Sequence, residues 1–159
     1  LAGAPYQPTE PSLFAEMLDA LALDFPQFTF IDIGSGKGRT LLMAAERPFR
    51  RIVGVELLPE LHRVALENIA KSHDPLRLTS LCADARDYLF PLEPLVIYLF
   101  NPLPASALAQ TIESLERSLK QSPRPVRIIY HNPVSGDVLE NASFLRKLTS
   151  THQYAIYSN

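Results

Sequence analysis

The chain has 159 residues, of which 47% are hydrophobic and 20% are charged, a balance typical of one folded domain. Fifteen basic against seventeen acidic residues give a net charge of −2, which excludes a global electrostatic footprint for nucleic acid. The single cysteine, Cys82, excludes an internal disulfide and a multi-cysteine zinc site, so we predict no metal centre and a reducing, cytoplasmic location. The longest apolar run, Leu95–Phe100, is too short for a membrane span. Because the chain begins at Leu1 rather than Met, we expect further residues upstream of this domain.

Strand and helix patterns alternate along most of the chain. Residues 1–10 are small, proline-containing and aperiodic, which predicts an extended arm. Pro11 then suits the first turn of a helix. The helix patterns cover residues 11–21, 39–47, 59–72 and 105–120. The strand patterns cover residues 28–33, 51–57, 76–82, 95–100 and 126–130.

The last part of the chain differs, because two short strand patterns follow each other there. Residues 144–149 and 154–157 are joined by a turn-like segment with no helix pattern between them, which predicts an antiparallel hairpin. The central strands are apolar on both faces, as in a parallel sheet with helices on both sides. We therefore predict that residues 1–159 form one doubly wound, mostly parallel α/β domain. In such sheets ligands bind beyond the carboxyl ends of the strands.

The first predicted strand runs into a glycine-rich loop. Gly34, Gly36 and Gly38 alternate with other residues, so a ligand could approach the backbone without meeting a Cβ. The spacing is not that of a P-loop, because Gly38 follows Lys37 directly. It is not the dinucleotide fingerprint either, because Arg39 takes the place of the third glycine, which disfavours a nicotinamide-dependent oxidoreductase. The alternative is that the loop is only a tight turn.

The next three strands each end in a polar residue. Glu56 could accept hydrogen bonds from both hydroxyls of a ribose, or serve only as an acid at the start of the following helix. Asp84 could accept a hydrogen bond from an adenine amine, or serve only as an N-cap. Asn101 offers a carbonyl and an amide beside Pro102, although this segment could also be a rigid strand-to-helix turn. Such residues at the ends of four successive strands point to one ligand site.

Taken together, these segments resemble class I (Rossmann-like) S-adenosylmethionine-dependent methyltransferases. FIDIGSGKGR is similar to the first motif of that family, IVGVELLPEL to the acidic second motif, CADAR to the third-strand acid and LVIYLFNPLP to the motif beside the transferred methyl. The resemblance implies a seven-stranded sheet whose last strand is antiparallel. It also implies that Gly34 and Gly36 face the methionine portion of the cofactor, oriented by Asp32, while Glu56 holds the ribose and Asp84 the adenine. The full set of residues expected at S-adenosylmethionine, or at the product S-adenosyl-L-homocysteine, is Asp32, Gly34, Ser35, Gly36, Glu56, Leu57, Asp84, Ala85 and Asn101.

A narrower resemblance concerns the methyl acceptor. Residues 4–9 are similar to an arm of small protein-lysine methyltransferases that helps close over the cofactor, so Tyr6 and Thr9 are expected to close here or merely to pack on the sheet. Asn101-Pro102 resembles the start of the Asn-Pro-Pro-aromatic motif of amino-group methyltransferases. The chain departs from that motif at positions 103 and 104, which removes the stacking ring and argues against a nucleic-acid acceptor.

The predicted reaction is therefore transfer of a methyl group to a nitrogen nucleophile such as a protein lysine. Asn101 and Pro102 are the candidate catalytic residues at the acceptor. His131 at the end of the fifth strand could remove a proton, or could be an ordinary hydrogen-bonded histidine. A small-molecule acceptor, and a catalytically silent module that only binds the cofactor, remain as alternatives.

Overall fold

The computed structural model describes residues 8–100 and 103–159 and contains one seven-stranded sheet, with strand order β3-β2-β1-β4-β5-β7-β6. All seven predicted strands are present. The strands are β1 Thr29–Ile33, β2 Arg51–Glu56, β3 Leu78–Cys82, β4 Leu95–Phe100, β5 Val126–His131, β6 Arg146–Ser150 and β7 Tyr154–Ser158. The α-helices are α1 Pro11–Leu21, α2 Arg39–Ala44, α3 Pro59–Ala70, α4 Ala105–Gln121 and α5 Gly136–Glu140.

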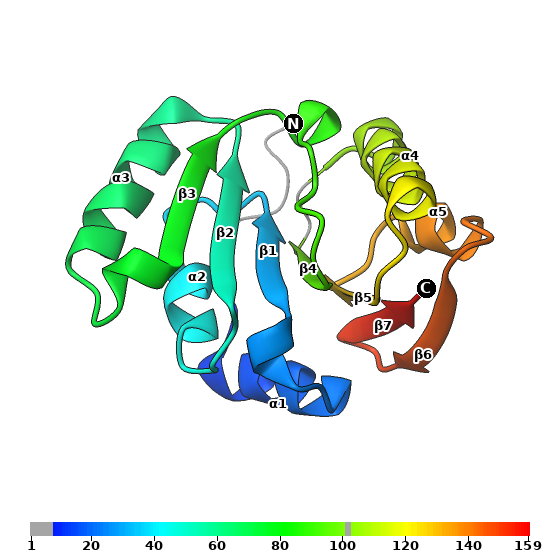
Figure 1. The fold of residues 1–159 in the computed structure, drawn as a ribbon, viewed down its shortest axis with the longest axis horizontal. Helices are drawn as coiled ribbons and strands as arrows, with labels where there is room; N and C mark the ends of the chain where they lie inside the picture. Colours follow the sequence, from blue (N-terminus) through cyan, green and yellow to red (C-terminus); the bar gives the residue numbers. More distant parts are fainter. Residues whose placement is uncertain (1–7, 101–102) are drawn as a thin grey trace.

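The first five strands are parallel, and helices pack on both faces of the sheet. One face packs against α1, α2 and α3, through a core that includes Phe14, Leu41 and Ile69. The other face packs against α4 and α5, through Leu108, Leu115 and Leu139. Figure 1 shows α3 near the β3 end of the sheet and α4 and α5 near the opposite end. A mostly parallel sheet with helices on both of its faces is the doubly wound α/β fold that the sequence predicted.

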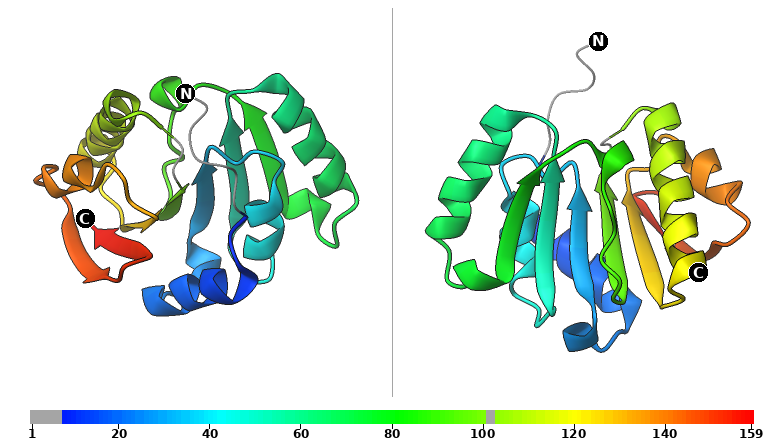
Figure 2. Two further views of the ribbon diagram at one scale, coloured as in Figure 1. Left: turned by 180° about the vertical axis from the view of Figure 1, so that it is seen from behind. Right: turned by 45° about the horizontal axis from the view of Figure 1, so that its top comes forward.

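The carboxyl-terminal hairpin forms the far edge of the sheet. β7 pairs antiparallel with β5, and β6 pairs antiparallel with β7. Both views of Figure 2 show these two strands at the edge opposite β3. The predicted hairpin and the antiparallel last strand are therefore confirmed.

Several element boundaries differ from the predictions for local reasons. α2 ends at Ala44 rather than at residue 47, because the backbone N–H groups of Glu46 and Arg47 bond to carbonyls three residues back and Pro48 has no N–H to continue the helix. β3 begins at Leu78, after a single 3₁₀ turn at Pro75–Arg77. α5 was not predicted, because its five residues are too few to show a helical period. None of these differences moves a strand end at which a site residue was expected.

Within the part of the chain that the structure describes, no helix is both long and apolar enough to cross a membrane.

Candidate active site

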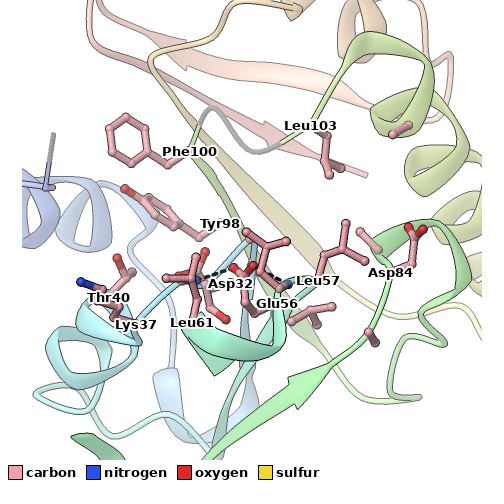
Figure 3. Close-up of a pocket in the computed structure, with 18 of the residues that line it drawn as sticks. Asp32, Lys37, Thr40, Glu56, Leu57, Leu61, Asp84, Tyr98, Phe100 and Leu103 are labelled. Carbon is pink, nitrogen blue, oxygen red and sulfur yellow. Dashed lines mark hydrogen bonds between the residues drawn. The ribbon is translucent and has the colours of Figure 1, made fainter. Parts of the chain in front are cut away.

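A cavity of about 1090 Å³ lies beyond the carboxyl ends of β1, β2, β3 and β4. Small-molecule sites are typically clefts of roughly 300–1,000 Å³, so this one has room for a cofactor and part of a second molecule. Its walls come from segments far apart in the sequence, including the glycine loop, Glu56, Asp84, Phe100 and Asn132. Figure 3 shows Phe100 and Leu103 on one side of the cavity, with Asp32 and Glu56 across from them.

The glycine loop connects β1 to α2 in a conformation that requires glycine. Gly34, Gly36 and Gly38 have φ angles of 81°, 56° and 84°, in the left-handed region that other residues rarely adopt. A Cβ at Gly36 would meet no atom within 4 Å, so this position is open, whereas a Cβ at Gly38 would lie 3.3 Å from Ala65 Cβ. The loop therefore exposes its backbone at Gly36 and packs against α3 at Gly38.

Ser35 lies in the same loop, but its hydroxyl faces inward. Ser35 is buried, and its hydroxyl has no hydrogen-bond partner among residues 8–100 and 103–159. A Cβ added to Gly54 would lie only 2.4 Å from Ser35 Oγ, so the hydroxyl packs over the β2 backbone at that glycine. The Ser35 backbone N–H donates to the carbonyl of Val55. Ser35 thus lines the cavity as predicted, while its hydroxyl fills the space above Gly54.

Glu56 holds the glycine loop in place. Its carboxylate accepts hydrogen bonds from the backbone N–H of Gly36 at 2.7 Å and from that of Leu58 at 2.9 Å. Only 7% of the residue is exposed, and it lines the cavity. Each carboxylate oxygen can accept more than one hydrogen bond, so these two contacts leave capacity for ligand hydroxyls.

Asp32 is a buried acid next to Glu56. It is 4% exposed, and burial together with the negative charge of Glu56 raises the pKa of its carboxyl to about 8. Asp32 is therefore protonated at neutral pH. A positively charged ligand group nearby would favour its ionised form.

Asp84 caps the short 3₁₀ turn that follows β3. Its carboxylate accepts hydrogen bonds from the backbone N–H of Arg86 and from the Arg86 guanidinium, which hold the pKa of Asp84 below its usual value. The N-cap that the sequence suggested is therefore present. Asp84 and Ala85 also line the cavity, as does Leu57, which is 59% exposed. The adenine contact remains a prediction.

The structure describes only some of the residues that were predicted to lie at the methyl acceptor. Asn101 and Pro102, and Tyr6 of the arm, lie outside the described residues. The residue before Asn101, Phe100, places an aromatic ring in the cavity wall (Figure 3). An aromatic ring is thus present at this wall although the sequence motif lacks its own.

His131 lies behind this wall rather than in it. Its ring stacks on Phe100, with centroids 4.0 Å apart and an interplanar angle of 13°. Its Nδ1 atom is hydrogen bonded to the hydroxyl of Tyr98 at 2.7 Å, and Tyr98 is 1% exposed. Burial lowers the pKa of His131 to about 4. His131 is thus neutral at physiological pH, and its use as a base remains a prediction.

Tyr98 also connects His131 to the described part of the arm. The Tyr98 hydroxyl is hydrogen bonded to the Thr9 side chain at 2.9 Å, and the Arg39 guanidinium donates to the Thr9 carbonyl oxygen. Thr9, Arg39 and Tyr98 all line the cavity. The sequence analysis missed Tyr98, because a tyrosine inside an apolar strand has the same pattern as a core residue.

Asn132 is a second cavity residue that was not predicted. It directly follows His131 and adopts a φ of 50°, which is uncommon for a residue other than glycine. The only sequence signal was an asparagine placed between a strand and a proline.

Comparisons with known proteins agree with the fold and the cavity. Residues 30–122, more than half of the chain, match a family model described as a methyltransferase domain. The search of curated proteins found no significant match.

Solved structures with the same fold include several methyltransferases. An RNA methyltransferase from Salinibacter ruber, in complex with S-adenosyl-L-homocysteine, is 19% identical with a TM-score of 0.59, covering 96% of this chain and 92% of its own. A ribosomal protein L11 methylase from Lactobacillus delbrueckii subsp. bulgaricus is 14% identical with a TM-score of 0.63, covering 98% and 88%. The glycopeptide N-methyltransferase MtfA is 10% identical with a TM-score of 0.70, covering 93% and 88%.

The residues fit the cofactor of such enzymes, since an open glycine backbone, a buried carboxylate and a cavity of sufficient size meet at the strand ends. The chain belongs to the methyltransferase-domain family and is an S-adenosylmethionine-dependent methyltransferase of the Rossmann-like class.

Proposed function

We propose that this enzyme transfers the methyl group of S-adenosylmethionine to a nitrogen nucleophile such as the side-chain amine of a protein lysine. The observation that carries the proposal is the apolar wall formed by Phe100, Leu103 and Pro104 at the end of β4. The family resemblance assigns this segment to the neighbourhood of the transferred methyl. An apolar wall lowers the pKa of a buried amine, which favours the neutral, nucleophilic form.

The charges around the cavity support a protein or small-molecule amine over a nucleic acid. Among the described lining residues, the basic side chains are Lys37, Arg39 and Arg86, and the acidic ones are Asp32, Glu56 and Asp84. Nucleic-acid binding depends mainly on several basic contacts to phosphates. One of these three basic residues, Arg86, is already paired with Asp84, so the cavity offers few free basic groups. The fold neighbours include a ribosomal protein methylase, a glycopeptide N-methyltransferase and an RNA methyltransferase, so they do not favour one class of acceptor over another.

The cofactor supplies an electrophilic methyl group, and the chain's own residues would position the two reactants. Glu56 would bind the ribose while fixing the backbone of Gly36, and Asp32 would orient the methionine portion. Asp84, Ala85 and Leu57 would line the adenine subsite. Asn101 and Pro102 would border the acceptor nitrogen. Orientation of this kind can account for several kcal/mol of a reaction barrier.

The experiment that tests the proposal offers three acceptor pools to the enzyme together with methyl-labelled S-adenosylmethionine. The pools are a library of lysine-containing peptides, total RNA, and a mixture of small-molecule amines. We expect label in the lysine peptides, and we expect Asn101→Ala to abolish transfer while the Kd for S-adenosyl-L-homocysteine changes less than twofold. Label in RNA alone would contradict the nitrogen acceptor of a protein. Wild-type activity in Asn101→Ala would contradict the role of Asn101.

A further inference from the structure

Asn132 combines an unusual backbone with a position in the cavity wall. Its φ of 50° lies in the left-handed region, and its backbone N–H donates to the carbonyl of Gln153 at 2.7 Å. Non-glycine residues in such conformations cluster at ligand-binding and active sites, because the surrounding structure must hold them there. The conformation thus raises the question of what Asn132 does at this cavity.

The surroundings of Asn132 fix its position relative to the β4 end. His131, the residue before it, pairs in register with Phe100 of the neighbouring strand and stacks on its ring. The hydrogen bond between His131 and Tyr98 anchors the same unit to the middle of the sheet. Asn132 therefore lines the cavity from a rigid support next to the apolar wall.

The carboxamide of Asn132 is available to a ligand. The residue is exposed, and its side chain has no hydrogen bond to any other residue in ranges 8–100 and 103–159. A carboxamide oxygen accepts a hydrogen bond without carrying a charge. A carboxylate near the acceptor nitrogen would stabilise the ammonium form, which cannot react. A neutral carboxamide oxygen can hold an amine N–H in place without this strong effect.

We infer that Asn132 binds the methyl-accepting nitrogen, its carboxamide oxygen accepting an N–H hydrogen bond so that the nitrogen lone pair faces the methyl group. This inference rests on the proposed nitrogen acceptor and adds to it a residue at the end of β5. It also gives the stacked His131–Phe100 pair a positioning role, because the pair supports the residue that contacts the acceptor.

The test compares two substitutions that both tolerate the left-handed backbone. Asn132→Gly removes the carboxamide without strain, and Asn132→Asp keeps its size but adds a negative charge. Asn141→Gly, at the end of α5 and with an ordinary φ of −84°, is the matched control. For each variant we would measure the folding midpoint, the Kd for S-adenosyl-L-homocysteine, and kcat and KM with the best lysine peptide of the wild type.

We expect Asn132→Gly to lower kcat/KM for the peptide by about tenfold to a hundredfold, with the Kd for S-adenosyl-L-homocysteine changed less than twofold. Asn132→Asp should lower kcat without raising KM, because the carboxylate favours the bound ammonium form. Asn141→Gly should match the wild type in Kd, kcat and KM, with at most a small fall in the folding midpoint from the added glycine.

The inference is overturned if folded Asn132→Gly methylates the peptide within twofold of wild-type kcat/KM, or if Asn132→Asp keeps wild-type kcat and KM. A different result would refute the proposed acceptor instead: wild-type enzyme that binds S-adenosyl-L-homocysteine but labels no lysine peptide. In that case the same Asn132 variants would be measured with a small-molecule amine that the wild type methylates, and unchanged kcat/KM in Asn132→Gly would overturn the inference there too.

Discussion

Replacing Asp32 with asparagine should change how the stability of the protein depends on pH. Asp32 is 4% exposed, and its pKa of about 8 arises first from burial and second from the charge of Glu56. The unfolded chain has the ordinary value, about 3.8. Between these two values the native state holds a proton that the unfolded state has lost, so the free energy of unfolding falls as the pH rises. This contribution is fully present below pH 3.8 and is lost by the time the pH has passed through 8.

The size of this loss of stability follows from the separation between the native and unfolded pKa values of Asp32. Each pH unit between the two pKa values changes the free energy of unfolding by about 1.4 kcal/mol. From pH 6 to pH 8 the wild type should therefore lose about 2.3 kcal/mol through Asp32, and the loss should reach about 2.7 kcal/mol at pH 9. Asparagine is nearly isosteric and does not ionise, so Asp32→Asn should lack this loss.

Urea unfolding followed by circular dichroism would measure the difference at half-unit steps from pH 6 to pH 9. The stability difference, variant minus wild type, should grow by about 2.7 kcal/mol across that range. His131 is common to both proteins, so its own titration cancels in the comparison. Parallel curves would refute the reasoning, because they would mean that Asp32 ionises in the native protein as it does in the unfolded chain.

Four further substitutions test other parts of the site. Glu56→Gln should weaken binding of S-adenosyl-L-homocysteine at least tenfold in calorimetry, because the backbone N–H of Gly36 or of Leu58 would then face an amide NH₂. Unchanged affinity would exclude Glu56 from the cofactor site. Gly54→Ala should lower the free energy of unfolding by about 1–3 kcal/mol in chemical denaturation, because the new Cβ would meet Ser35, and an equally stable variant would show that the loop adapts. Tyr98→Phe should cost about 1–3 kcal/mol in the same assay, because it removes the hydrogen bonds to Thr9 and His131, and a neutral result would count against the buried network. His131→Gln should keep kcat within about fivefold if His131 only positions its neighbours, whereas a loss of about a hundredfold or more would identify it as the base.

The part of the cavity formed by the glycine loop and the ends of β2 and β3 could be predicted from the sequence because its signals are local. Asp32, Gly34 and Gly36 lie within five residues of the chain, and their strand is marked by an apolar run that stops at a glycine. Glu56 and Asp84 likewise come directly at or after a strand. A parallel sheet brings the carboxyl ends of its strands to one edge, so identifying the strands was enough to predict that these residues share a cavity.

The rest of the site could not be predicted in this way, because its contacts join distant parts of the chain. Thr9 and Tyr98 are 89 positions apart, and Tyr98 and His131 are 33 apart. A period-two or period-3.6 pattern reports which face of an element is apolar, and it does not report which hydroxyl lies opposite which ring nitrogen. The positive φ of Asn132 is set by the turn that hydrogen bonds to Gln153, so no residue pattern within the strand shows it.

Glu56 shows why the sequence alternatives for a single residue need not exclude each other. Its carboxylate binds the backbone N–H of Leu58 ahead of α3, which is the local role that any acid in that position could have. The same carboxylate accepts a hydrogen bond from the backbone N–H of Gly36 and so fixes a glycine of the loop whose Cβ position is open. A ligand held by Glu56 would therefore meet a loop already arranged by the same carboxylate. Because little reorganisation is left for the ligand to induce, most of its contact energy can appear as affinity.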